Sequence, residues 1–412
     1  MEKHKESIGE NRQNAIPNAK TSGSRTPNVP ALRFPEFTGE WRFVHLEEVA
    51  EFQKQRIFTA LLNNGNYIST ENILQNFEGI QYSSSIPANT NVIEYQKGDI
   101  LLSNIRPYLK KVWFADRKGG CSADVFVLRG DKCDQHFLYY VIASNRFINY
   151  VMSGAKGVKM PRGDKSQMEK YAFSIPTNTE QRKIAKFLSM LDERIRLQNK
   201  IIEKYESLIQ AIIYRAKMDG MSKGTWRRID LYKVLHERNE KNVEGRTICS
   251  VSVSQGVVNQ IEYLGRSFAA KQTGHYNVVK YGDIVYTKSP TGDFPYGIIK
   301  RSTIIEDVAV SPLYGVYIPI NDSIGVILHF YFMQPSNAFN YLHPLIQKGA
   351  KNTINITNGR FLENSVPLPI SENEANTIAE ILKSIQEKIE IEKSLLQSYA
   401  KEKEFLLRQM FI

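Results

Sequence analysis

Residues 184–212 read IAKFLSMLDERIRLQNKIIEKYESLIQAI. Apolar side chains recur here at alternating steps of four and three, the heptad spacing of a helix that packs along a partner helix. The positions are Ile184, Leu188, Leu191, Ile195, Gln198, Ile202, Tyr205, Ile209 and Ile212, with Gln198 as the one polar member. At about 1.5 Å per residue, residues 180–217 form a helix about 55 Å long, which is too long for one domain to cover. This helix therefore needs a long partner.

A partner occurs in the same chain, 194 residues further on. The same register there reads Ile378, Leu382, Ile385, Ile389, Glu392, Leu396, Tyr399, Lys403 and Leu406. One apolar heptad helix is more often buried on its own domain, but two in one chain favour an antiparallel coiled coil with a globular domain at each end. Gln198 and Glu392 then set the register of the pair, unless both are simply solvated.

The rest of the chain is also duplicated, in the same order, with a shift that drifts from 184 to 195 residues. The matched stretches are residues 39–42 with 224–227, 97–100 with 281–284, 144–147 with 336–339, and 154–156 with 349–351. Any one match has little weight, but their common order over half the chain indicates internal duplication.

Short β-branched and aromatic runs, broken by Gly, Pro and Asn, indicate that each half holds a mixed α/β domain. We expect strands at residues 99–103, 125–128, 283–287 and 316–319, and helix over residues 137–152. The fold class is α+β, with two similar α/β domains separated by two long helices and related by a pseudo-two-fold axis. The predicted segments are a flexible arm at 1–30, domains at 31–176 and 223–369, and long helices at 177–222 and 370–412.

Composition favours an anionic partner. The formal net charge is +11, and the basic excess lies mainly in the two domains, with 18 basic and 15 acidic residues in the first and 16 and 11 in the second. Such a balance suits a partner such as nucleic acid or a membrane surface. No apolar run is long enough to span a membrane, and residues 1–30 lack the apolar core of a signal peptide, so we expect a soluble, cytoplasmic protein.

Four loops mix cations with amides and hydroxyls, the side chains that hold phosphates and read base edges. They cover residues 103–111, 156–165, 271–276 and 348–360. A solvated surface loop is the ordinary explanation for any one of them, but two lie at corresponding places of the repeat. The predicted DNA contacts are Arg106, Lys110, Lys156, Lys159 and Arg162 in the first domain and Lys271, Lys351, Asn352, Asn358 and Arg360 in the second.

Motifs for chemistry are missing. The sequence has no phosphate-binding P-loop, no G-x-G-x-x-G and no H-E-x-x-H, and the three cysteines lack C-x-x-C spacing, so we predict no metal and no catalytic site. Ser103, Asp99 and Asp283 lie at strand ends, where a turn residue is the far more common explanation than a catalytic one.

With these features, the chain resembles the DNA-specificity subunit of type I restriction-modification systems. The resemblance rests on three stretches: Phe34 to Trp41, Lys97 to Lys110, and Ile175-Pro176 leading to Glu180-Gln181-Arg182-Lys183. The second half departs from it, with Asn373-Glu374-Ala375-Asn376 and Ser289-Pro290-Thr291-Gly292 at two of these places.

The resemblance implies that the two domains are target recognition domains for the halves of a bipartite double-stranded DNA sequence, and that the helices are spacers. It also implies two methyltransferase subunits docked on the helices and added restriction and translocase subunits. S-adenosylmethionine, ATP and Mg²⁺ would be bound by those partners, and none by this non-catalytic chain.

Two other readings stay open. One is a structural coiled-coil protein whose basic domains bind nucleic acid without sequence preference, which would show a steep salt dependence and little discrimination. The other is an enzyme with an unrecognised site, which would turn over substrate alone and fail when Asp99 or Asp283 is replaced.

Overall fold

The structure is a computed structural model that describes residues 28–82, 85–266, 269, 272–348 and 354–412. The chain divides into two compact units. Unit 1 comprises residues up to Leu191 together with Lys401–Ile412, and unit 2 comprises Asp192–Ala400. The predicted arm lies largely outside the described residues.

Unit 1 is a mixed α/β domain. A four-stranded sheet has the order β2-β9-β6-β7, a second has the order β3-β5-β8-β4, and β1 pairs with β10. Its strands are β1 Arg42–His45, β2 Ala50–Phe52, β3 Arg56–Phe58, β4 Tyr67–Ile68, β5 Asn91–Tyr95, β6 Ile100–Ser103, β7 Val112–Phe114, β8 Gly119–Cys121, β9 Val125–Gly130 and β10 Ala172–Ile175. Its helices are α1 Leu46–Val49, α2 Gln135–Ile142, α3 Asn145–Ser153 and α4 Lys165–Glu169.

Unit 2 repeats part of this frame, with a four-stranded sheet of the order β12-β19-β16-β17 and with β11 paired with β22, while its other strands form the pairs β13-β14, β15-β18 and β20-β21. Its strands are β11 Trp226–Asp230, β12 Leu235–Glu237, β13 Cys249–Ser252, β14 Gly256–Asn259, β15 Asn277–Val279, β16 Ile284–Tyr286, β17 Ile299–Arg301, β18 Val308–Val310, β19 Gly315–Pro319, β20 Gln347–Lys348, β21 Ile354–Asn355 and β22 Ser365–Pro369. Its shorter helices are α6 Gln260–Leu264, α7 Asp322–Phe332, α8 Pro335–Leu342 and α9 Asn358–Phe361. The shared strand order confirms the duplication.

The four strands expected from sequence are present as β6, β9, β16 and β19. The single helix expected over residues 137–152 is wrong in one respect, because it is two helices, α2 and α3. Ala143 leaves the helical conformation, and the Ser144 hydroxyl accepts a hydrogen bond from the Phe147 N–H at 3.2 Å, so a new helix starts there. A serine followed by an apolar run is an N-cap signal that the unbroken apolar pattern had hidden.

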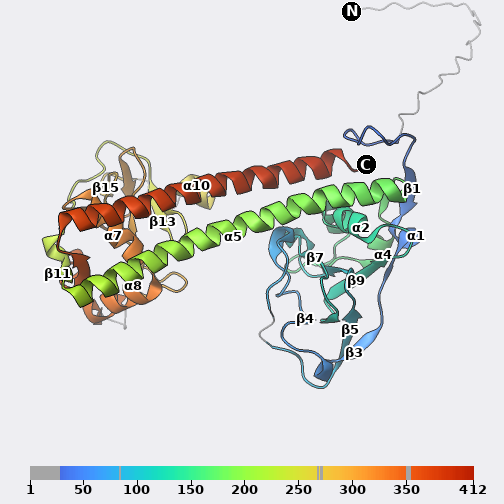
Figure 1. The fold of residues 1–412 in the computed structure, drawn as a ribbon, viewed down its shortest axis with the longest axis horizontal. Helices are drawn as coiled ribbons and strands as arrows, with labels where there is room; N and C mark the ends of the chain where they lie inside the picture. Colours follow the sequence, from blue (N-terminus) through green and yellow to red (C-terminus); the bar gives the residue numbers. More distant parts are fainter. Residues whose placement is uncertain (1–27, 83–84, 267–268, 270–271, 349–353) are drawn as a thin grey trace, which may run out of the picture. The chain divides into compact units, whose positions relative to one another are not determined.

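Two long helices accompany the domains, α5 over Asn178–Lys223 and α10 over Glu372–Gln409 (Figure 1). In unit 2 they pack antiparallel, because Arg194 bonds to the Tyr399 hydroxyl while Gln198, further along α5, bonds to Glu392, earlier in α10. The buried apolar heptad positions there are Ile202, Ile209, Leu382, Ile385 and Ile389, and the polar Gln198 is buried with them. In unit 1, Ile184 and Leu188 join the core that contains Leu406. The remaining predicted positions, Leu191, Ile195, Tyr205, Ile212, Ile378, Leu396, Tyr399 and Lys403, are half-buried.

A short strap, residues 28–37, lies against the start of α5 within unit 1. Arg33 forms two hydrogen bonds of 2.8 Å with the buried carboxylate of Glu180, and Phe34 packs edge-on against Phe187. The Leu32 N–H donates to the carbonyl of Gln409 at 3.0 Å and so satisfies one of the last backbone acceptors of α10. The strap therefore ties both helix ends to the first domain.

Candidate nucleic-acid interface

The turn before β6 holds a buried carboxylate. Asp99 accepts a hydrogen bond from the Gln96 N–H at 2.7 Å and two more, each 2.7 Å, from the Arg129 guanidinium on β9. The carboxylate is 2% exposed, and its bonds raise the pKa of the Arg129 guanidinium. Because a charge buried this deeply needs a partner, Asp99 fixes the turn and the start of the strand.

Asp283 does the same in unit 2, with a cation from a different strand. It accepts from the Lys280 N–H at 2.8 Å and from Arg238, just after β12, at 2.6 and 3.0 Å. This geometry gives both aspartates the turn role that the sequence favoured over a catalytic one.

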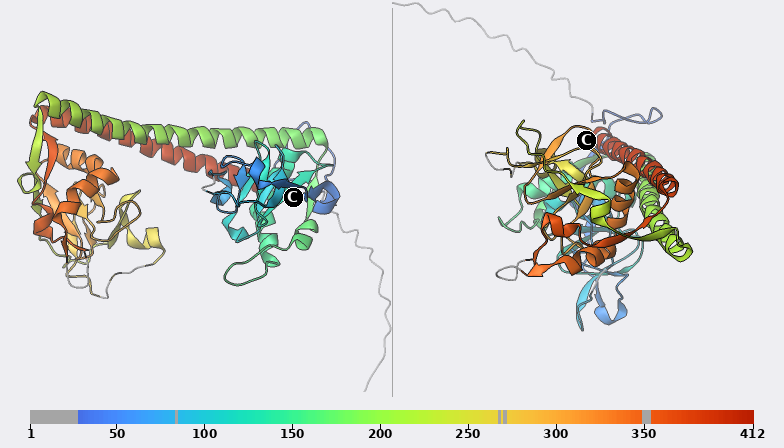
Figure 2. Two further views of the ribbon diagram at one scale, coloured as in Figure 1. Left: turned by 90° about the horizontal axis from the view of Figure 1, so that it is seen from below. Right: turned by 90° about the vertical axis from the view of Figure 1, so that its left-hand side faces the viewer.

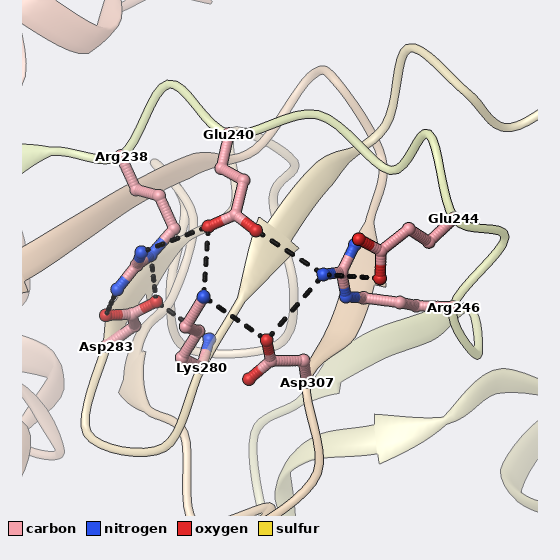
Figure 3. A network of polar contacts seen from close by, with 7 residues as sticks. All are labelled: Arg238, Glu240, Glu244, Arg246, Lys280, Asp283 and Asp307. Carbon is pink, nitrogen blue, oxygen red and sulfur yellow. Dashed lines mark hydrogen bonds and ion pairs between the residues drawn. The ribbon is translucent and has the colours of Figure 1, made fainter.

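Further charges in unit 2 extend this pair into a network (Figure 3). Glu240 contacts Arg238, Arg246 and Lys280, and Asp307 contacts Arg246 and Lys280, at 3.2 to 3.8 Å. The pKa of Arg238 is raised mainly by its hydrogen bonds to Asp283 and less by Glu240, while Glu240 and Asp307 raise the pKa of Lys280, because carboxylate partners favour the charged forms. Three basic side chains of the second domain are thus already matched by carboxylates.

In unit 1, β6 leads into a basic loop, residues 103–111. Arg106 and Lys110 both have left-handed backbone conformations, with φ of 51° and 55°, and flank a single 3-10 turn, Pro107–Leu109. A left-handed backbone conformation is energetically unfavourable for residues other than glycine. Non-glycine residues with this conformation occur most often at functional sites. The turn buries Pro107 and leaves Arg106 and Tyr108 exposed.

A second loop, residues 154–163, lies beside the first. Lys156 and Arg162 exchange two backbone hydrogen bonds of 2.9 Å, which closes a hairpin, and Gly157 turns its tip with φ of 97°. The Arg106 N–H donates to the carbonyl of Pro161 at 2.8 Å, so the two loops are joined by backbone contacts. Figure 2 shows this loop projecting from the body of unit 1. We call residues 103–111 with 154–165 the basic double loop.

The structure thus brings together the five residues predicted for the first domain. Lys156 contacts Asp164 at 2.7 Å, and Arg162 contacts Asp124 at 2.8 Å, while both side chains stay largely exposed. Lys159 and Arg106 are exposed, and Lys110 is half-buried. The double loop carries seven basic residues against one acidic residue, Asp164. The double loop is therefore a strongly cationic surface, and the buried residues Ser103, Pro107 and Pro161 anchor it to the domain.

In unit 2 the predicted residues are placed differently. Asn358 is half-buried and donates to Glu237 at 2.7 Å, and Arg360 donates to the carbonyl of Leu345 and to Glu363, each at 2.9 Å. Both lie on the short helix α9 and are engaged within the domain. The other three predicted contacts, Lys271, Lys351 and Asn352, lie outside the described residues.

Sequence reasoning overlooked the apolar side chains of the double loop. Tyr108, Val158 and Met160 are exposed among the cations. They belong to no helical or strand period, so a search for periodic apolar residues passes over them. The available signal was their position in a loop of Gly, Pro and Lys, where no core explains an apolar side chain.

Among the described residues, no group of three or more His, Cys, Asp or Glu side chains is placed to hold a metal, and no helix is long and apolar enough to cross a membrane. A hollow of about 640 Å³ in unit 2 is lined by residues that include Glu262 and Glu306. Two carboxylates make this hollow a poor binder of phosphate groups.

The fold and its loops define a duplicated α/β scaffold with two long helices and a basic surface in unit 1. A family model described as the type I restriction modification DNA specificity domain matches residues 38–207 and 237–398. The chain belongs to this family.

The chain is also similar to one curated protein and to solved structures. The type I restriction enzyme EcoDI specificity subunit of Escherichia coli is 24% identical over 205 residues, which cover 47% of this chain and 45% of that protein. The chain thus matches less than half the length of this relative. The crystal structure of the S subunit of a type I restriction-modification system from M. genitalium has a TM-score of 0.60 and 15% identity, and the match covers 93% of this chain and 99% of that one. The HsdS subunit from Thermoanaerobacter tengcongensis matches over 90% of this chain and 96% of its own with 18% identity and a TM-score of 0.35.

Proposed function

We propose that this chain is the specificity subunit of a type I restriction-modification complex and selects a bipartite double-stranded DNA target. The observation that carries the proposal is the basic double loop, which is mounted on a frame that occurs twice in the chain. A repeated frame with different loops suits two domains that each read one half-site, because base choice depends on loop side chains while docking depends on the frame.

The chain performs no chemistry itself in this proposal. Asp99 and Asp283 are bound to arginines inside the domains, which removes the two carboxylates that the enzymatic alternative would use. Methylation with S-adenosylmethionine, and cleavage with ATP and Mg²⁺, belong to the methyltransferase and restriction subunits. The site of action is the cytoplasm, where the DNA is.

The long helices provide matched surfaces for two methyltransferase subunits. Leu197 and Ile391 are 46% and 66% exposed, and Ile201 and Leu395 are 39% and 37% exposed. Each pair is separated by 194 residues, the shift that relates the two helices. Exposed apolar side chains repeated at equivalent places suit two identical partners, since each partner meets the same surface.

The test compares lysine variants in DNA binding. Lys159→Ala should weaken binding to all duplexes and lower the slope of log K against log salt by about 1, because one phosphate contact is lost. The matched control is Lys132→Ala. Lys132 is also exposed, but it follows the far end of β9. The double loop begins at the other end of this strand, where Val125 pairs with Ser103.

Sequence preference separates this proposal from the alternative. Full-length protein, with the subunits that co-purify with it, selects duplexes from a random pool, and the enriched sequences are read. Two short motifs at a fixed gap are expected. Enrichment of no motif, with a steep salt dependence, would refute the proposal in favour of a non-specific nucleic-acid binder.

A further inference from the structure

The tip of the hairpin in the double loop exposes two apolar side chains. Val158 is 104% exposed relative to its reference state, and Met160 is 48% exposed. Scattered exposed apolar residues are ordinary on a protein surface. These two differ because they lie two residues apart at the tip of one hairpin, on either side of Lys159. The backbone pairing of Lys156 with Arg162 closes this hairpin.

The base of the hairpin is held from both sides. Lys156 and Arg162 are bridged to each other, Ile105 is bridged to Arg162, and the Gly163 N–H donates to the carbonyl of Asn104 at 3.1 Å. Pro161 is buried at this base. An anchored hairpin presents its tip in a restricted set of positions, so a ligand that meets Val158 and Met160 does not have to order the whole loop.

The charge around the tip indicates what that ligand is. Lys159 lies between the two apolar residues in sequence, and Arg106 is joined to the hairpin through its backbone. A protein partner with an apolar patch would have to accept this concentration of cations. Duplex DNA offers phosphates for the cations and, between them in the groove, base edges that include an apolar group, the C5 methyl of thymine.

We propose that Val158 and Met160 are specificity-determining residues that read thymine by contact with its C5 methyl group. The inference rests on the proposed function, since it requires that this domain bind a defined DNA half-site. The cations of the double loop hold the phosphates on either side, and the hairpin tip enters the groove between them. Direct readout of thymine by apolar side chains needs no hydrogen-bonding group at the tip; Val158 supplies none, and Met160 supplies only a weakly accepting thioether sulfur.

Uracil substitution tests this contact without altering the hydrogen-bonding edge of the base. The probe is the duplex that the wild-type protein selects from a random pool, with each thymine of its motifs replaced in turn by uracil. For the wild-type protein, uracil at one position should weaken binding about fourfold, which corresponds to ~0.8 kcal/mol for one buried methyl group. The protein with Val158→Ala and Met160→Ala should bind thymine and uracil equally at that position.

Lys159→Ala is the matched control, because it changes the same tip but should keep the thymine preference while lowering affinity for every duplex. Both alanine changes are at exposed positions, and circular dichroism of the variants checks their folding. The inference is overturned if the wild-type protein distinguishes thymine from uracil nowhere, or if the double variant keeps the full discrimination. A wild-type protein that selects no motif at all would instead overturn the proposed function.

Discussion

Replacing the buried Asp283 is the most direct test of what stabilises the turn before β16 and the sheet of the second domain. Asp283→Ala removes the carboxylate that receives two hydrogen bonds from Arg238 and one from the Lys280 N–H. Arg238 is only 15% exposed, so its charge loses its main partner inside the protein. Glu240, at 3.4 Å, compensates in part. We expect a loss of about 3 kcal/mol, at the lower end of the range for broken buried ion pairs.

The equivalent change in the first domain should cost less. Arg129, the partner of Asp99, is 35% exposed and can turn its guanidinium to water once the carboxylate is gone. The remaining loss is the hydrogen bond to the Gln96 N–H and a partly solvated ion pair, together about 2 kcal/mol. The repeat therefore supplies two variants of one turn that differ mainly in the burial of the arginine.

Hydrogen exchange followed by mass spectrometry measures both effects in the same molecule. Opening free energies of amides in β16 and β6 report the two domains separately, which a single melting curve of a two-domain chain does not. Arg238→Met combined with Asp283→Ala should recover part of the loss, because no charge is then left unpaired. If Asp283→Ala changed the opening of β16 by less than about 1 kcal/mol, the assignment of this pair to the frame would be wrong.

Three further predictions concern polar side chains that are buried or half-buried. His329 is half-buried, and its pKa is lowered to about 3, mainly by desolvation and further by Lys300 and Arg301. Since the unfolded chain takes up the proton below about pH 6.5 and the folded chain does not, unit 2 should lose up to about 2 kcal/mol by pH 5 in urea titrations, and His329→Asn should abolish this loss. Gln198→Leu should speed exchange in the helix pair, because it leaves the half-buried carboxylate of Glu392 without its amide donor, and adding Glu392→Leu should reverse this; slower exchange in the single variant would contradict the assigned packing. Arg33→Met leaves Glu180 buried without its cation, so protease cleavage near residue 33 should accelerate, and adding Glu180→Gln should reverse most of that effect.

The long-range frame was predictable because it repeats. Heptad spacing identified α5 and α10, and the order of matched stretches identified two similar domains, since both signals sum over many residues. The turn residues Asp99 and Asp283 stood out for the same reason. The break between α2 and α3 was missed because one serine cap is a weaker signal than a continuous apolar run.

The surface that meets a ligand was harder to predict, because nothing in its sequence is periodic. In the first domain the predicted cations do share one surface, yet the exposed Val158 and Met160 between them were not selected. In the second domain, Asn358 and Arg360 matched the composition of a reading loop, but both are bonded to groups of their own domain. Whether a polar side chain is free depends on tertiary contacts that composition does not reveal.

The formal charge of a domain, counted from its sequence, is a poor measure of the charge that DNA can reach. By sequence the second domain has the larger basic excess, which would make it the stronger partner for DNA. The structure matches Arg238, Arg246 and Lys280 with carboxylates, so these three contribute little to the field that a phosphate meets. In the first domain, Lys159 and Arg106 are exposed on an anchored double loop. Because affinity for phosphates follows accessible charge and not formal charge, the first domain should account for more of the salt dependence of binding than its smaller excess suggests.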